Sequence, residues 1–200
     1  IKDLKIRKNI FYVNLENKKK LNKIVSKIKP KTIYHLATYG GSSEQKNYKK
    51  IENTIYKGTI NLIEACKKYN FKLFINTGSS SEYGFKNKPM KETDSLKPNS
   101  TYSFFKGMTT SACKYYSNSE NLPIVTVRPF HVYGPYESHT RLIPTLIRSI
   151  TKGKKISLVD PKISRDLIYI DDLIKFYIFL SNFKKQKYIN GKVYNLGYGR

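Results

Sequence analysis

The sequence has few cysteines and no long apolar run, and each absence excludes a class of protein. Cys66 and Cys113 lie far apart and form no CxxC pair, which argues against a disulfide framework and a zinc ribbon and favours a reducing compartment. No apolar run approaches the roughly 20 residues that span a bilayer. Residues 1–5 lack the apolar stretch of a signal peptide. We therefore expect a cytoplasmic protein without a membrane partner.

Acidic residues are also scarce. The chain has 14 Asp and Glu against 38 Lys and Arg, a formal net charge of +24. Only six of the basic residues are arginines, and the lysines are spread along the whole chain, whereas specific nucleic-acid surfaces rely on clustered arginines. The charge therefore predicts no specific nucleic-acid partner, although a general positive field attracts an anionic substrate.

Short apolar runs alternate with segments of helical periodicity over 200 residues, a length that fits one domain with its own core. Strands are predicted at 9–13, 32–36, 71–75, 123–127, 156–159, 166–170 and 193–196. Helices are predicted at 21–28, 48–69, 101–118, 142–152 and 171–181. This alternation predicts an α/β fold with a mostly parallel sheet covered on both faces. Ligands of such sheets bind at the carboxyl ends of strands, here in the loops that begin at about residues 36, 76 and 128.

Ser79, Ser80 and Ser81 follow one of these strands and place hydroxyl groups at the predicted ligand edge. The alternative is a turn that uses serine only for local backbone hydrogen bonds. The three histidines, His35, His131 and His139, do not share metal-ligand spacing, so no metal site is expected.

Tyr102 and Lys106 are four residues apart on the next predicted helix, so both side chains share one helix face. A phenol has a pKa of about 10 and needs a nearby cation to ionise near neutral pH. With Lys106 one turn away, the pair is suited to removing a proton from a substrate hydroxyl. A second pair, Tyr188 and Lys192, contains Gly191 just before a strand. The spacing alone is therefore not specific, and the position of Tyr102 after the serine loop distinguishes it.

Six short motifs occur in order along the chain, at residues 29–37, 53–65, 77–84 with the Tyr102 and Lys106 pair, 128–135, 165–172 and 195–197. They resemble the motifs of the extended short-chain dehydrogenase/reductases, which include the NAD-dependent epimerases and dehydratases of nucleotide sugars. The resemblance covers nearly the whole chain. It implies a Rossmann-like, doubly wound parallel sheet.

The resemblance also implies roles for individual residues. Tyr102 would be the acid/base of hydride transfer at C4 of the sugar. Ser79 would hydrogen-bond the reacting hydroxyl, and Lys106 would hold the nicotinamide ribose and lower the Tyr102 pKa. NAD, with NADP not excluded, would be bound by Asn14 (in the place of a usual Asp), Leu36, Ala37, Asn53, Thr77, Gly78, Tyr102, Lys106 and Pro129.

The implied substrate is a nucleotide-diphosphate sugar. Ser79 and Ser80 would contact the sugar, and the guanidinium groups of Arg141 and Arg165 suit its diphosphate. His131 stands where an Asn usually contacts the substrate. Its alternative role is that of a satisfied polar residue at a strand end.

The serine loop bears on the reaction type. The family's 4,6-dehydratases carry Thr-Asp-Glu where this chain has three serines, and Glu82 would supply an acid only with a one-residue shift. This favours a 4-epimerase or a 4-keto reductase over a 4,6-dehydratase. The alternative function is a Rossmann-like binding protein that has lost catalysis and binds RNA through its basic surface.

The glycine-rich fingerprint of the family, G-x-G-x-x-G or G-x-x-G-x-x-G, does not occur. The resemblance therefore implies a fragment, truncated at both ends, that by itself binds NAD poorly because it lacks this phosphate-binding turn. It divides the chain into an incomplete NAD(P)-binding domain at 1–138, part of a substrate-binding lobe at 139–170, and a return helix with the last strand at 171–200. The family's interface implies a homodimer through helices 48–69 and 101–118.

Overall fold

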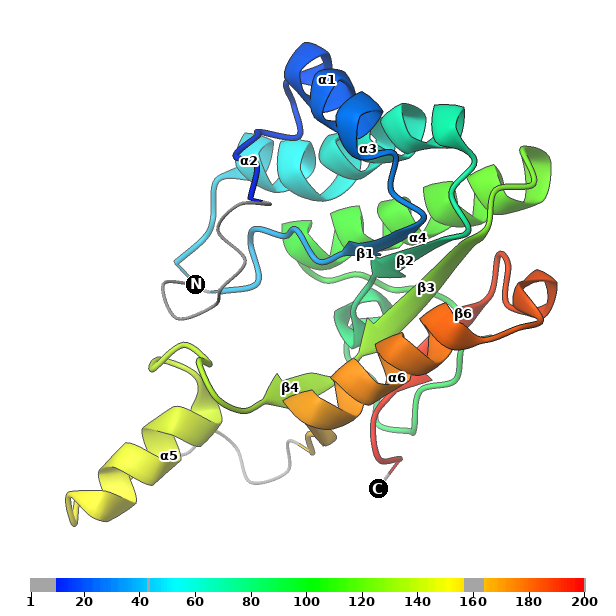
Figure 1. The fold of residues 1–200 in the computed structure, drawn as a ribbon. Coiled ribbons are helices and arrows are strands. Elements are labelled where there is room, and N and C mark those ends of the chain that lie inside the picture. The colour runs from blue at the N-terminus through cyan, green and yellow to red at the C-terminus, as the bar shows by residue number, and fades with distance from the viewer. Residues whose placement is uncertain (1–9, 43, 157–163, 200) are drawn as a thin grey trace.

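The computed structural model describes residues 10–42, 44–156 and 164–199, and its centre is a parallel sheet of four strands in the order β1-β2-β3-β6 (Figure 1). The strands are β1 (Thr32–His35), β2 (Leu73–Thr77), β3 (Ile124–Pro129) and β6 (Val193–Leu196). Every neighbouring pair runs parallel. The predicted α/β class with a parallel sheet is confirmed.

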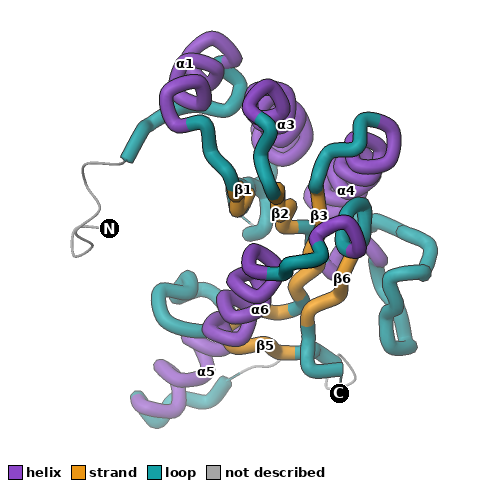
Figure 2. The backbone as a smooth tube through the Cα atoms, turned by 45° about the vertical axis from the view of Figure 1, so that its right-hand side comes forward, coloured by secondary structure: helices purple, strands orange, loops and turns teal. Residues whose placement is uncertain are grey.

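Helices cover both faces of this sheet (Figure 2). One face carries α1 (Lys18–Ile28), α3 (Gly58–Cys66) and α4 (Thr101–Ser119), and the other carries α6 (Ile170–Asn182). The helix expected at 48–69 is helical throughout but changes its hydrogen-bond pattern. It consists of α2 (Tyr48–Glu52), one turn of π-helix (Asn53–Lys57), α3, and a short 3-10 turn (Lys67–Tyr69).

Strand β2 shows how the core is divided between the two faces. Phe74 packs with residues of α1, α3 and α4, whereas Leu73 and Ile75 pack with residues of α6. Successive side chains of a strand point to opposite faces, so both layers draw on the same strand. All three side chains are fully buried. A strand buried on both faces has a continuous apolar sequence, and this is the pattern that predicted it.

A second, two-stranded parallel sheet extends from the carboxyl edge of the first. β4 (His131–Tyr133) follows β3 after one residue and pairs with β5 (Leu167–Tyr169). Helix α5 (Leu142–Thr151) lies beyond it, at the opposite end of the molecule from α1 (Figure 1). The strand expected at 166–170 is thus confirmed as β5, whereas residues 157–159 of the strand expected at 156–159 lie outside the described residues.

The strand expected at 9–13 is wrong over the part that the structure describes. Residues 10–13 form no strand, and Phe11 and Tyr12 are exposed. Their side chains favour a strand, but strand formation depends on packing against neighbouring strands, and β1 pairs only with β2 among the described strands. Val13 packs against the cluster formed by α1 and α3 instead.

Cys66 and Cys113 are both buried and free. Within the described ranges, no helix is long and apolar enough to cross a membrane. In the same ranges, no group of three or more His, Cys, Asp or Glu side chains is arranged to hold a metal ion.

His35 links the end of β1 to α3. Its Nε2 lies 2.7 Å from Oγ1 of Thr59, and the Thr59 hydroxyl donates to the Ile55 carbonyl at 2.5 Å, so a neutral imidazole donates the first bond. Burial and the charge of Lys106 lower the pKa of His35 to about 3.

We expect the free energy of unfolding to fall as the pH decreases from 6.5 to about 3. In this window the unfolded chain binds a proton on His35 that the native protein does not, so acid favours unfolding. Denaturant titrations at several pH values measure the effect. The His35→Gln variant should lose stability less steeply than the wild type over this range, and equal slopes would contradict the expectation.

Candidate active site

A cleft of about 1840 Å³ opens where the strands of the main sheet end. Leu36 follows β1, Thr77 ends β2 and Pro129 ends β3, and all three line the cleft. The loops that the sequence singled out therefore meet at one edge of the sheet. The predicted site residues that line the cleft are Leu36, Thr77, Gly78, Ser79, Ser80, Tyr102, Lys106, Pro129, His131, Arg141 and Arg165.

Three predicted cofactor residues, Asn14, Ala37 and Asn53, are not in the lining of this cleft as the structure describes it. The Asn14 side chain accepts a hydrogen bond from the Glu16 backbone N–H at 3.0 Å. The Asn53 amide donates to the Glu16 carboxylate at 2.8 Å. Ala37 is exposed. The cofactor roles of these three residues stay predictions.

The serine loop leads from β2 into a single 3-10 turn, Ser80–Tyr83. Ser79 precedes that turn, and its Oγ accepts from the Ser81 backbone N–H at 3.2 Å and lies 2.7 Å from the Ser81 hydroxyl. Ser79 therefore makes the local hydrogen bonds of a turn and lines the cleft as well. The two interpretations of the serine loop both describe part of its structure.

Helix α4 presents Tyr102 and Lys106 to the cleft from its first two turns. The Ser100 side chain caps this helix by accepting from the Ser103 backbone N–H at 3.2 Å. The ammonium of Lys106 lies 5.8 Å from the centre of the Tyr102 ring and donates to the Thr77 carbonyl at 2.6 Å. The predicted shared face of the helix is confirmed, and it meets the end of β2.

The acidity of Tyr102 differs from the expectation. Burial raises its pKa, and hydrogen bonding with the Ser79 and Thr38 side chains opposes that rise. The Lys106 ammonium lies 5.8 Å from the centre of the Tyr102 ring, and it donates to the Thr77 carbonyl rather than to the phenol. Desolvation thus sets the direction of the Tyr102 shift in this structure, and the expectation that Lys106 lowers this pKa stays a prediction.

Lys106 itself has a perturbed pKa. The residue is 5% exposed, and burial lowers the pKa of its ammonium to about 8, while the negative charge of Glu82 acts in the opposite direction. The ammonium thus holds its proton less tightly than an exposed lysine does. Residues with strongly shifted pKa values in a cleft are candidates for catalytic groups.

His131 and Arg165 form a pair on the other side of the cleft. Nη1 of Arg165 donates to Nε2 of His131 at 2.6 Å, which requires the imidazole to be unprotonated at that atom. Burial and the charges of Arg165 and Arg141 lower the pKa of His131. Nδ1 of His131 is buried and has no hydrogen-bond partner within the described part of the chain. The pair orients a guanidinium towards the cleft without neutralising its charge.

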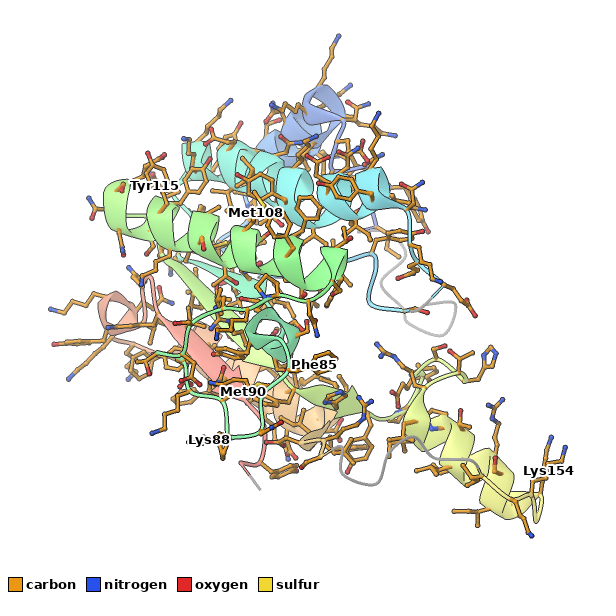
Figure 3. All side chains as sticks on the ribbon, turned by 180° about the vertical axis from the view of Figure 1, so that it is seen from behind. Phe85, Lys88, Met90, Met108, Tyr115 and Lys154 are labelled. Atoms are coloured by element: carbon orange, nitrogen blue, oxygen red, sulfur yellow. The ribbon has the colours of Figure 1, made fainter. Side chains whose placement is uncertain are left out.

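Positive charge dominates the lining of the cleft. The cationic side chains are Lys46, Lys86, Lys88, Lys91, Lys106, Arg141 and Arg165, and the acidic ones are Glu92, Glu137 and Asp166. Three of the lysines come from one loop between the 3-10 turn and α4, in which Phe85, Lys88 and Met90 are marked in Figure 3. Such a cleft attracts anionic ligands.

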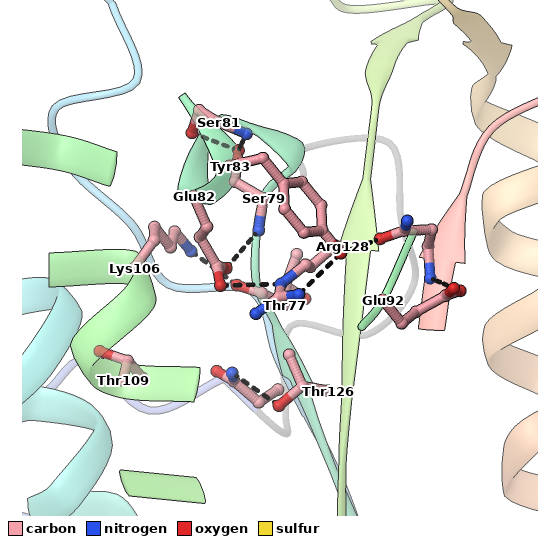
Figure 4. A network of polar contacts seen from close by, with 12 residues as sticks. Thr77, Ser79, Ser81, Glu82, Tyr83, Glu92, Lys106, Thr109, Thr126 and Arg128 are labelled. Atoms are coloured by element: carbon pink, nitrogen blue, oxygen red, sulfur yellow. Dashed lines mark hydrogen bonds and ion pairs between the residues drawn. The ribbon is translucent and has the colours of Figure 1, made fainter. Parts of the chain in front are cut away.

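Sequence reasoning named Glu82 and the segment that contains Arg128 but missed their pairing, which supports the serine loop. Glu82 is fully buried and pairs with Arg128, whose Nη1 donates to the Tyr83 hydroxyl (Figure 4). The two charges are 46 residues apart in the chain, so no local pattern connects them. The sequence feature that could have indicated this ion pair is Glu82 itself, because acidic residues are rare in that loop.

The chain is similar to known proteins over most of its length. The model of the NAD dependent epimerase/dehydratase family matches residues 2–197. The dTDP-D-glucose 4,6-dehydratase of Dictyostelium discoideum is 29% identical over 92% of this chain and 45% of its own length. UDP-glucuronate 4-epimerase 4 of Arabidopsis thaliana is 31% identical over 84% of this chain and 41% of its own.

The solved structures agree with these relatives. The UDP-glucuronic acid 4-epimerase of Bacillus cereus, in complex with UDP-glucuronic acid and NAD, is 31% identical, with a TM-score of 0.78. The match covers 88% of this chain and 56% of that one. The chain thus spans about half the length of the proteins that it matches.

Gly78 gives a test of the packing around the serine loop. A Cβ at this position would lie 2.6 Å from Oε1 of Glu82 and 3.1 Å from Cγ2 of Thr126. We expect Gly78→Ala to lower the free energy of unfolding by about 1–3 kcal/mol, as overpacking does. Thermal or denaturant unfolding measures the loss.

Gly107→Ala is the matched control. A Cβ at Gly107, inside α4, meets only Leu96 at 3.5 Å, an ordinary contact, and Ala is the better helix former by up to about 1 kcal/mol. This variant should be as stable as the wild type or more so. If Gly78→Ala behaves in the same way, the described packing of Glu82 against Gly78 is incorrect.

Proposed function

The chain belongs to the NAD dependent epimerase/dehydratase family, and from this membership we propose that the protein is an NAD(P)-dependent enzyme of nucleotide-sugar metabolism. Its substrate is a nucleotide-diphosphate sugar, and the reaction is hydride transfer at C4 with Tyr102 as the acid/base. The observation that carries the proposal is the arrangement of Ser79, Tyr102 and Lys106 in one cleft at the carboxyl edge of the sheet.

Tyr102 moves the proton of the reacting hydroxyl. Because burial raises its pKa, the phenol holds its proton at neutral pH and is ready to donate it to a carbonyl oxygen at C4. In the opposite direction the phenolate accepts the proton of the hydroxyl. Ser79, whose side chain hydrogen-bonds with Tyr102, holds the same substrate oxygen in line with the phenol.

The residues present fit a nicotinamide cofactor, which when bound supplies the hydride acceptor and donor. An ammonium has three N–H donors, and Lys106 uses one of them for the Thr77 carbonyl. Its remaining donors suit the hydroxyl groups of a ribose. Leu36, Gly78 and Pro129 line the same part of the edge, where the ends of three strands meet.

The substrate diphosphate fits the basic side of the cleft. Arg165 is oriented by His131, and Arg141 stands at the start of α5, where its charge reaches both His131 and Tyr102. One guanidinium group can bind two phosphate oxygens at once through two parallel N–H donors. The relatives that act on UDP-glucuronate make a UDP-sugar the first candidate.

The serine loop favours a 4-epimerase or a 4-keto reductase over a 4,6-dehydratase. Elimination of water needs an acid that faces the sugar, and the loop offers hydroxyls at Ser79, Ser80 and Ser81. Glu82 does not line the cleft and is held by Arg128. It is therefore not available for elimination.

An apolar groove of about 660 Å³ on the outer face of α4 supports a homodimer. Figure 3 shows Met108 and Tyr115 on this helix. The groove is lined by Tyr56, Ile60, Leu96, Pro98, Phe104, Gly107, Met108, Ser111, Ala112, Tyr115 and Tyr116. It lies between the 48–69 segment and α4, the helices expected at the dimer interface.

We place the enzyme in the cytoplasm, where the free thiols of Cys66 and Cys113 stay reduced. The division at 138 and 170 and the RNA-binding alternative both stay predictions.

Tyr102→Phe in the full-length protein tests the acid/base. We expect turnover, followed by nicotinamide absorbance and product analysis, to fall by about 10²–10⁴-fold while NAD(P) binding, measured by calorimetry, persists. Tyr188→Phe is the matched control, because Tyr188 belongs to the second Tyr-x-x-x-Lys pair and is exposed. Unchanged turnover in Tyr102→Phe would remove Tyr102 from its role.

The product distinguishes the three reaction types. We expect UDP-glucuronate, UDP-N-acetylglucosamine or dTDP-glucose to be inverted at C4, or the corresponding 4-keto sugar to be reduced, without loss of water. Mass spectrometry detects the loss of water, and NMR reads the configuration at C4. Accumulation of a dehydrated 4-keto-6-deoxy sugar would contradict the assignment from the serine loop.

A further inference from the structure

A buried ion pair lies directly beneath the serine loop. Oε2 of Glu82 accepts from Nε of Arg128 at 2.8 Å, and the two side chains are 0% and 4% exposed. Removing two charges from water costs several kcal/mol for each ion, and an apolar pair of similar volume often stabilises a protein as well or better. The ion pair is therefore poorly explained by stability alone.

The second oxygen of Glu82 fixes the backbone of Ser79. Oε1 accepts from the Ser79 N–H at 2.9 Å, while the Ser79 side chain caps the same 3-10 turn, so the two residues hold each other. Gly78 permits this contact, because any side chain there would meet the carboxylate. The position of the Ser79 hydroxyl at the cleft thus depends on the position of Glu82.

Arg128 extends the contact to β6. Its Nη1 donates to the Tyr83 hydroxyl at 2.7 Å, and that hydroxyl donates to Oδ1 of Asn195 at 2.8 Å. The backbone N–H of Asn195 donates to Oε1 of Glu92, and the side-chain amide of Asn195 donates to the Met90 carbonyl. Asn195, Glu92 and Met90 all line the cleft. One continuous set of hydrogen bonds therefore joins the serine loop to β6.

Glu82 is also the anion that faces Lys106. Figure 4 shows its carboxylate between Lys106 and Arg128. The other titratable groups that act on the ammonium are His35 from β1 and Cys113 and Tyr102 from α4. Burial keeps these three neutral, with a pKa of about 3 for His35, a pKa of about 12 for Cys113 and a raised pKa for Tyr102.

We propose that Glu82, locked by Arg128, is a positioning residue of the Ser79, Tyr102 and Lys106 site. One carboxylate oxygen sets the Ser79 backbone, and the negative charge keeps the Lys106 ammonium protonated in its buried place. Glu82 touches neither substrate nor cofactor, because it does not line the cleft. This inference rests on the proposed function. It assigns the control of charge in the active site to a residue that is not one of the reacting groups.

Glu82→Gln in the full-length protein is the first test, because the amide still accepts a hydrogen bond but carries no charge. We expect both limbs of the pH–activity profile to move to lower pH by about one unit, since loss of a nearby anion lowers the pKa of both Lys106 and Tyr102. We expect kcat to fall about tenfold, with a smaller change in KM. An unchanged pH profile would overturn the proposal.

A direct readout does not need turnover. The Lys106 signal in a protein with ¹³C-labelled lysine, assigned through Lys106→Arg, should titrate near 8 in the wild type and at lower pH in Glu82→Gln. Glu64→Gln is the matched control. Glu64 also binds a lysine and a tyrosine, Lys67 at 2.8 Å and Tyr116 at 2.7 Å, but outside the lining of the cleft, so it should shift neither the signal nor the profile.

Two more variants separate the effect of the Glu82 charge on Lys106 from the effect of the Glu82 contact on Ser79. Glu82→Asp keeps the charge but shortens the reach to Ser79, so kcat should fall while the Lys106 titration stays near that of the wild type. If Glu82→Gln does not fold because Arg128 loses its counter-charge, the double variant Glu82→Gln with Arg128→Gln removes both charges, and the Lys106 titration should still move to lower pH. A Lys106 titration like that of the wild type in the neutral variant would overturn the proposal.

Failure of this proposal and failure of the proposed function give different results. If the wild type turns over no nucleotide sugar, the proposed function fails, and the lysine titration still tests Glu82. If Tyr102→Phe is inactive but Glu82→Gln keeps the wild-type profile and titration, only the role of Glu82 fails.

Discussion

Burial of the Lys106 ammonium is the constraint on which the rest of the site depends. A cation that is 5% exposed is stable only if nearby groups replace the water that it has lost. The Thr77 carbonyl and the Glu82 carboxylate take that place. The end of β2, the serine loop and the second turn of α4 therefore have to meet at one point. Glu82 is buried in turn, and Arg128 from β3 compensates its charge.

Much of the placement of these elements around the site could be predicted from local sequence. Apolar runs predicted β1, β2, β3 and β6, and helical spacing put Tyr102 and Lys106 on one face of a helix. The rule that ligands bind at the carboxyl ends of parallel strands then brought Leu36, Thr77 and Pro129 together without any knowledge of packing. These inferences need only the spacing of apolar residues in each predicted strand or helix and the direction in which the chain runs through it.

The parts that could not be predicted depend on burial and on distant contacts. Spacing placed Lys106 near Tyr102, but the sign of the pKa shift depends on how deeply the phenol is buried, which the sequence does not give. The pairing of Glu82 with Arg128 joins two segments far apart in the chain. Residues 10–13 have the composition of a strand, yet their conformation depends on whether a neighbouring strand is present.

The junction between the two sheets has a mechanical consequence. The N–H of Phe130 donates to the Leu196 carbonyl of β6 at 2.9 Å, and the next N–H, of His131, donates to the Asp166 carbonyl beside β5 at 3.0 Å. The chain therefore changes sheets within one residue, and β5 continues directly into α6. If the second sheet, which carries Arg165, rotated relative to the main sheet, the backbone would have to bend at these two junctions. Any such rotation would therefore change the width of the cleft mouth.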